Sequence, residues 1–245
     1  MKRNNQFDRS QAFDNQELIK RIAYHEAGHA AAIYLCNKQK KLPPVHFQIT
    51  INKRDDSLDN PFETRPMSKE HIVAAVEGGR LIHNLPITLI ESANYFSVDE
   101  QDTYQTAFEA DMINLLVGPI AEAKYVSICD NESFGKHLIT PDSLHYYGGA
   151  SDLERVKEYL ESFIPAKERH EDKINELFNK AFAFIDSHKS WRAISNLANH
   201  ILSNHKNIVT CEEAIYILEQ NQTSPFDMNF IKADPIEKYV IQFSG

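Results

Sequence analysis

The sequence has little cysteine and no surplus of positive charge, and both shortages exclude classes of protein. Its 245 residues include three cysteines, Cys36, Cys129 and Cys211, which are far apart and form no C-x-x-C pair. An odd and scattered set argues against a disulfide framework and a cysteine-based zinc finger, and it fits a reducing compartment. The formal net charge of −9 leaves no basic excess to cover phosphates, so we expect no nucleic-acid partner.

Long apolar runs and nucleotide-binding motifs are also lacking. No apolar run approaches the roughly 18 to 20 residues that a membrane helix needs, and the polar N-terminus has no secretory apolar region. We therefore expect a soluble, cytoplasmic protein with no membrane partner. The phosphate loop G-x-x-x-x-G-K-[ST] of many ATPases is absent as well.

The apolar pattern that is present is mostly helical. The spacing predicts helices over about residues 15–37, 68–85, 108–126, 151–163, 168–187, 190–204 and 210–220. Alternation of apolar and polar residues over 45–51, with β-branched residues, predicts one strand. Together these patterns predict a mainly α fold, of α+β type, with one small β-sheet and a C-terminal helical bundle. We expect a single domain over 1–224, followed by a tail at 225–245.

Particular residues mark the expected ends of these helices. Asp14, with Glu17 three residues later, is typical of a helix N-cap with a capping-box partner. Ser151 is expected to cap a later helix in the same way. Gly118-Pro119 is expected to break or bend the helix at 108–126, because proline lacks the amide hydrogen that a helix interior needs.

The first predicted helix contains the five residues His25-Glu26-Ala27-Gly28-His29, which spell H-E-x-x-H. Residues four apart on a helix share one face, so both histidines can direct an imidazole nitrogen at one metal ion, usually zinc. Glu26 is then placed to take a proton from a metal-bound water. Gly28 in mid-helix costs about 1 kcal/mol relative to alanine, which a plain structural helix has little reason to accept. The motif therefore predicts a zinc-dependent peptidase with Glu26 as general base.

A catalytic zinc needs a third protein ligand, and the motif does not supply it. No further histidine follows His29 at the spacing of an extended zinc motif. The candidates elsewhere in the chain are acidic residues and histidines, namely Glu122, His137, His145, Asp152 and Glu154. Spacing alone does not choose among them.

Several segments appear in an order that is shared with a known family. They are YHEAGHA at 24–30, PVH at 44–46 leading into a strand, VGPIAE at 117–122, GASDL at 149–153, and paired helices from about 168 to 220. In this order they resemble the zinc motif, the next strand, the G-G-R-x-A-E helix, the G-A-S-N-D-L segment and the C-terminal helices of one peptidase domain. The chain thus resembles the zincin-like peptidase domain of the FtsH family of ATP-dependent zinc proteases, as a stand-alone domain.

The resemblance implies roles for two carboxylates. The aspartate of the G-A-S-N-D-L segment is the third zinc ligand in that family, which makes Asp152 the expected third ligand here. Glu122 lies on a helix expected near the site, where a hydrogen bond to His25 or His29 would fix the imidazole tautomer. A plain packing or surface role is the equal alternative for Glu122. A second electrophile is plausible but not identified. Three residues just before the Asp152 segment could approach the cleft, namely His145, Tyr146 and Tyr147, but ordinary loop residues are the favoured interpretation.

The chain also departs from the family. The ATPase module and the membrane helices are missing, and residues from about 55 to 105 form an insert between the strand and the helix that carries Gly118. Pro119 and Ile120 stand where the family has glycine and arginine. The resemblance therefore implies the chemistry of the site, but not ATP-driven unfolding, a membrane location or a hexameric ring.

The expected function is that of a metalloendopeptidase with Zn²⁺ as cofactor, which hydrolyses bonds in peptides or unfolded protein segments. Without an unfoldase module in this sequence, folded clients would need a separate ATPase or unfoldase partner. Strand residues are expected to pair with an extended substrate by β-augmentation, namely Ile49, Thr50 and Ile51.

The alternative is a latent or non-catalytic peptide-binding protein that retains the zinc peptidase fold. In that case the 55–105 insert covers the cleft, with Phe62, Pro66, Tyr95 and Phe96 as its packing residues. Retention of Glu26 argues against a pure binding role, since a binder has no need of a base there. An accidental H-E-x-x-H in a helical scaffold is the remaining alternative, and bound metal would exclude it.

Overall fold

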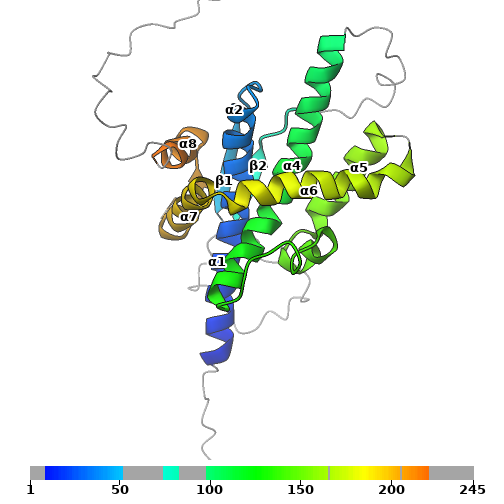
Figure 1. Cartoon of the computed structure of the whole chain (residues 1–245). Helices are drawn as coiled ribbons and strands as arrows, with labels where there is room; N and C mark the ends of the chain where they lie inside the picture. The colour runs from blue at the N-terminus through cyan, green and yellow to red at the C-terminus, as the bar shows by residue number, and fades with distance from the viewer. Residues whose placement is uncertain (1–8, 52–73, 83–97, 165, 205, 221–245) are drawn as a thin grey trace, which may run out of the picture.

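Two long helices, α1 (Arg9–Ala31) and α4 (Val98–Cys129), pack against each other and carry much of the core (Figure 1). The computed structural model describes residues 9–51, 74–82, 98–164, 166–204 and 206–220. Small residues allow the close approach, because a Cβ added at Gly28 would lie 2.8 Å from the Cβ of Ala121. The expected cost of a glycine in mid-helix therefore has a packing reason.

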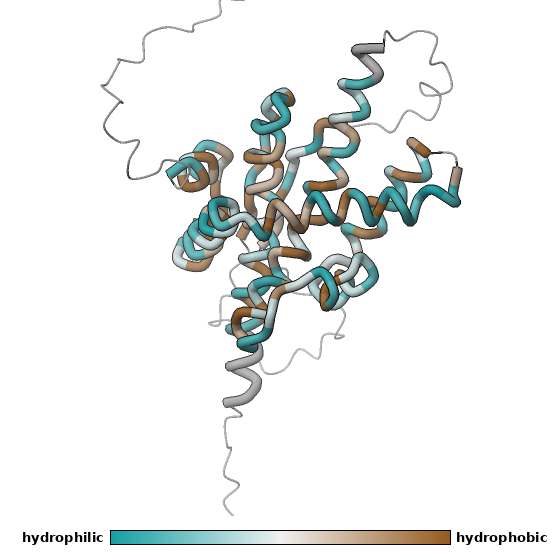
Figure 2. Tube along the Cα trace, in the orientation of Figure 1, coloured by the Kyte–Doolittle hydropathy of each residue, from teal (hydrophilic) through white to brown (hydrophobic). Residues whose placement is uncertain are grey.

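The remaining helices surround this pair. After α1 the chain continues through a π-helical turn η1 (Ala32–Cys36) and α2 (Asn37–Gln39). After α4 come η4 (Pro141–Tyr147), α5 (Ala150–Phe163), η5 (Lys167–Arg169), α6 (His170–Asp186), α7 (His188–Ser203) and α8 (Cys211–Glu219). Helices α5 and α6 pack on α4, α7 packs on α1, and α8 packs on α7. Apolar stretches of α1, α4 and α6 gather where these helices meet (Figure 2).

A small antiparallel sheet lies against α1, with the strand order β2-β1-β3. Its strands are β1 (Phe47–Ile51), β2 (Ala74–Gly78) and β3 (Ile208–Val209). Ile49 of β1 faces Val76 of β2 on one side and Val209 of β3 on the other. Apolar residues at alternate positions of β1 are buried, as the period of a strand requires.

The predicted fold class is confirmed at the level of a mostly helical chain with one small sheet. The first strand and the helices from 151 onward lie close to their predicted ranges. Two predicted caps are wrong. Helix α1 begins at Arg9, so Asp14 lies inside it, and α5 is capped by Gly149, so Ser151 is already helical. Most of the 55–105 insert and the tail at 225–245 lie outside the described residues.

The predicted helix at 68–85 is wrong over its described part. Residues Ala74–Gly78 form β2, which pairs along its whole length with β1. Gly78 and Gly79 then adopt φ values of 86° and 78°, which end any helical or strand geometry. Pairing with β1 therefore decides the structure of a segment whose alanine and valine residues suit either state.

Helix α4 runs through Gly118-Pro119 without the expected break. Part of it, Asp102–Cys129, is long and apolar enough to cross a membrane by length and composition, which corrects the expectation that no such stretch exists. Leu116, Val117 and Ile120 in this stretch are fully buried by neighbouring helices. The apolar character of α4 is thus accounted for by its place in the core.

Candidate metal centre

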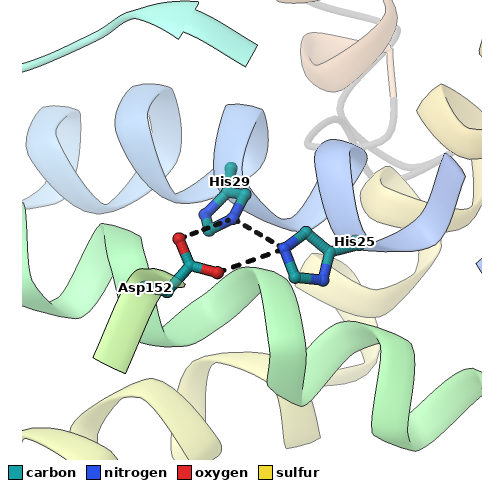
Figure 3. Close-up of side chains that lie close together, drawn as sticks. All are labelled: His25, His29 and Asp152. Carbon is teal, nitrogen blue, oxygen red and sulfur yellow. Dashed lines mark hydrogen bonds and ion pairs between the residues drawn. The ribbon is translucent and has the colours of Figure 1, made fainter. Parts of the chain in front are cut away.

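Three predicted ligands converge at one point (Figure 3). His25 and His29 project from the same face of α1, and Asp152 comes from the first turn of α5. Their ligand atoms lie within 4.8 Å of one another, and their side chains are only 10 to 12% exposed. Among the described residues this is the only such group of histidine, cysteine and acidic side chains.

The outer nitrogens of both imidazoles bind acceptors, which turns the inner nitrogens toward the centre. His25 Nδ1 lies 3.1 Å from Glu122 Oε2, and His29 Nδ1 lies 2.8 Å from the carbonyl oxygen of Asn114. A carboxylate and a carbonyl only accept hydrogen bonds, so each Nδ1 carries the hydrogen and each Nε2 is left to face Asp152. This is the arrangement that fixes the tautomer of metal-binding histidines.

The distances between the inner atoms suit a small divalent metal ion. The two Nε2 atoms are 3.0 Å apart, and they lie 3.4 and 3.6 Å from oxygens of Asp152. Adjacent ligands of a tetrahedral zinc ion with bonds of about 2.0–2.1 Å are separated by about 3.3 Å. Two imidazole nitrogens and one carboxylate oxygen could thus hold a metal ion, and this donor set suits several divalent transition metals.

The electrostatics of the site favour a positive charge at its centre. Burial lowers the pKa of His25, but hydrogen bonds to Asp152 and Glu122 outweigh it and raise the pKa to about 10. Burial likewise lowers the pKa of His29, and Asp152 raises it above its ordinary value. The pKa of Asp152 falls below its usual range because the two imidazoles outweigh its burial. A divalent cation would satisfy the same carboxylates without protonation of the histidines.

Glu122, the hydrogen-bond partner of His25, also forms an ion pair with an arginine. Arg21, one turn before His25 on α1, lies 2.7 Å from Glu122 Oε1, while the other oxygen of Glu122 accepts from His25. The carboxylate is only 6% exposed. The predicted hydrogen bond from Glu122 to a motif histidine is therefore present, whereas Arg21 was not anticipated, since nothing in its spacing marks it.

Glu26, next to His25 on α1, reaches the sheet. Its Oε2 accepts a hydrogen bond of 2.7 Å from the backbone N–H of Val76 in β2. Because it donates to Glu26, that N–H points away from β1, to the free side of β2, which is an outer strand of the described sheet. The carboxylate of Glu26 thus lies at a strand edge, close enough to the two histidines for its charge to raise the pKa of both.

The other candidates for the third ligand do not converge on this point. His137, His145 and Glu154 are exposed, and none of them belongs to the group of converging ligand atoms. The ring of His145 hydrogen-bonds the carbonyl oxygen of Asp142 within its own short helix. The side chain of Tyr146 points into solvent, 71% exposed, whereas its carbonyl oxygen accepts a hydrogen bond of 3.1 Å from Arg21.

The expected pairing of a substrate with Ile49, Thr50 and Ile51 is corrected by the sheet. β1 is its central strand and pairs with β2 along its length and with β3 at two of these residues. The N–H of Ile51 donates to the carbonyl of Asn207. No free edge remains at these positions, and β3 was too short for its pattern to be recognised.

A cleft of about 380 Å³ opens from the metal centre along β2. It is lined by residues of α1, η1, β2, α4 and α5 and of the turn after β2: His29, Ile33, Val76, Gly78, Gly79, Arg80, Asp111, Asn114, Leu115, Asp152, Arg155 and Tyr159. The cleft therefore offers room for a ligand next to two of the three converging side chains.

No protein-family model, curated protein or solved structure matches this chain. The resemblance to the FtsH family therefore stays a prediction from its motifs.

Proposed function

We propose that this protein is a zinc-dependent metallopeptidase whose zinc ligands are His25, His29 and Asp152. The observation that carries the proposal is the convergence of three ligand atoms, two of them from imidazoles whose outer nitrogens are engaged by acceptors. A bound zinc ion would supply a Lewis acid that activates water and polarises a carbonyl group. The distances, the burial and the excess of carboxylates around the histidines support this assignment.

Residues of the chain would then supply the general base and orient the zinc ligands. Glu26 acts as general base, taking the proton of the attacking water and passing it to the leaving amine. Glu122, held by Arg21, keeps the His25 ring in place and its Nδ1 protonated. The carbonyl of Asn114 does the same for His29.

The outer edge of β2 is the better candidate for peptide binding. The N–H of Val76 points toward Glu26, and Val76 lines the cleft beside the metal centre. An extended peptide that pairs with this edge brings its backbone to the base and the metal centre together. This mode gives backbone recognition, and it suits peptides or unfolded segments rather than folded proteins.

The test is cleavage of a peptide library by zinc-loaded protein, compared with the Glu26→Gln variant by mass spectrometry. Loss of a positioned general base lowers the rate about 10²- to 10⁴-fold, so cuts should vanish while zinc stays bound. The matched control is Glu17→Gln, a half-buried glutamate of the same helix whose side chain is 44% exposed, and this variant should cut normally. Equal cutting by the Glu26→Gln variant, or none by the wild type, contradicts the proposal.

A further inference from the structure

The cleft beside the metal centre carries two arginines that the proposed chemistry does not use. Arg80 follows β2, and Arg155 lies on α5 three residues after Asp152. No ion pair within 4.0 Å joins either guanidinium group to another described residue. Unpaired guanidinium groups in a cleft are suited to bind a carboxylate, because their planar N–H groups match its two oxygens.

Arg80 sits on a segment whose backbone is fixed. Gly78 and Gly79 turn the chain with positive φ, and the N–H of Gly79 donates to the carbonyl of His46 at 2.9 Å. The next two backbone N–H groups, of residues 81 and 82, donate to the two oxygens of Asp111 at 2.9 and 2.8 Å. The position of Arg80 at the cleft is therefore set by the main chain on both sides.

Asp111 is, with Asp152, one of the two acidic residues that line the cleft, and it could compete for Arg80. Its carboxylate is 3% exposed and accepts from two backbone N–H groups and, at 3.2 Å, from the hydroxyl of Tyr159. Its oxygens are thus committed to holding the 80–82 segment to α4. Asp111 attracts Arg80 over a distance, but it leaves the guanidinium donors open.

Arg155 is one helical turn beyond Asp152, on the side of α5 that lines the cleft. A residue three positions along a helix lies about 4.5 Å further along its axis, so Arg155 borders the space next to the metal centre. Tyr159, a further turn on, continues the same wall. The positive charge therefore lies close to the place where a bound peptide would be cut.

A buried amide in the same cleft also lacks a partner. Asn114 is 5% exposed, and neither its side-chain oxygen nor its nitrogen has a hydrogen-bond partner among the described residues. Its backbone carbonyl is the one that holds His29, so its position is fixed relative to the metal centre. Leaving such a group unpaired is unfavourable, and a polar ligand in the cleft would satisfy it.

We propose that Arg80, Arg155 and Asn114 form a carboxylate-binding subsite beside the metal centre. This inference rests on the proposed peptidase function and names its substrate class. Preferred substrates present a carboxylate close to the cleaved bond, either as an acidic side chain or as the C-terminal carboxylate of the peptide. The two arginines bind the carboxylate, and the amide of Asn114 donates to or accepts from its neighbouring peptide group.

The test measures binding and cutting separately on the full chain. Zinc-loaded Glu26→Gln protein is incubated with four pools of random decapeptides: free C-terminal acids and C-terminal amides, each prepared once with Asp and Glu and once with Asn and Gln in their place. Retained peptides are quantified by mass spectrometry. The same pools are given to the active protein, and Arg80→Gln, Arg155→Gln and the exposed-face control Lys157→Gln are compared in both assays.

Peptides with a carboxylate should be retained about tenfold better than neutral ones, because charge-assisted hydrogen bonds contribute about that factor. Either arginine variant should lose most of this preference, and Lys157→Gln should keep it. If peptides without acidic side chains are retained better as free acids than as amides, the subsite binds the C-terminal carboxylate. If amides with Asp and Glu are instead retained better than amides without them, the subsite binds acidic side chains.

Cutting without preference for carboxylates, or a preference that survives both arginine variants, overturns the subsite and leaves the peptidase proposal intact. Carboxylate-dependent retention that is lost in the arginine variants, without cutting of any pool, supports the subsite and contradicts the peptidase proposal. The two failures are therefore distinguishable.

Discussion

At the scale of single residues, the candidate centre depends on the hydrogen-bond partners of the two histidines as much as on the ligands themselves. Each histidine has its outer nitrogen engaged, one by a carboxylate and one by a backbone carbonyl. An imidazole held in this way loses little freedom when it binds a metal. The carboxylate partner can be changed by mutation, so its contribution can be measured.

Glu122→Gln should weaken zinc binding about 10- to 100-fold, the usual effect of removing a carboxylate behind a metal-binding histidine. The amide still accepts a hydrogen bond, but it loses the charge that polarises His25 and pairs with Arg21. Competition with a chromogenic chelator measures the affinity. Glu132→Gln, an exposed residue outside the site, is the control and should bind zinc normally. Unchanged affinity in Glu122→Gln would mean that Glu122 is only a packing residue.

Some residues of the site could be predicted from the sequence and others could not. The i, i+4 spacing of His25 and His29 determines that both lie on one helix face, so this pair could be predicted from pattern alone. Asp152 is 123 positions away from His29, and only the motif resemblance selected it from five candidates. The Val76 N–H and the Asn114 carbonyl could not be predicted, because every residue has such groups and only the fold brings them close.

At the scale of elements, the centre depends on the close approach of α1 and α4. A Cβ added at Gly118 of α4 would lie 2.3 Å from His29 Nε2, well inside van der Waals contact. This glycine therefore leaves the space that the imidazole occupies.

Gly118→Ala should displace the His29 ring and lower zinc affinity at least tenfold. By helix propensity alone the same change stabilises a helix interior by about 1 kcal/mol. The two effects have opposite signs, so zinc titration and thermal unfolding of the metal-free protein separate them. A higher Tm together with unchanged zinc affinity would show that the ring is not confined by Gly118.

Elements differ in how far local sequence determines them. Helices α6 and α7 have apolar residues on one face and polar residues on the other, and they were predicted closely. Strand β2 was predicted as helix, because its alanines and valine carry no strand-specific signal and its structure depends on pairing with β1, about 25 residues earlier. Long-range pairing of this kind is not visible in a local pattern.

At the scale of the whole molecule, acid stability should depend on a charged cluster between α4 and α6. Burial raises the pKa of Glu109, but Lys173 and Lys180 outweigh it and lower the pKa to about 2. A carboxylate with a lowered folded-state pKa stabilises the protein above its unfolded pKa, near 4.5, and this contribution is lost as pH falls toward 2.

Wild-type protein should therefore lose about 1–2 kcal/mol more stability than Glu109→Gln between pH 4.5 and pH 2, after allowance for the exposed side chain of Lys180. Urea unfolding at a series of pH values, on metal-free protein, measures the difference. Subtracting the two curves removes the contribution of Asp152, which titrates in both. Parallel curves would show that the cluster is screened by solvent.

We expect the whole chain to hold one zinc ion through His25, His29 and Asp152. Native mass spectrometry of the full chain after zinc loading and desalting tests it most directly, beside His29→Ala and Asp152→Ala. The wild-type chain should carry one zinc ion, and both variants should lose it while they keep the folded charge-state distribution. A wild-type chain without zinc, or variants that keep it, would contradict the claim.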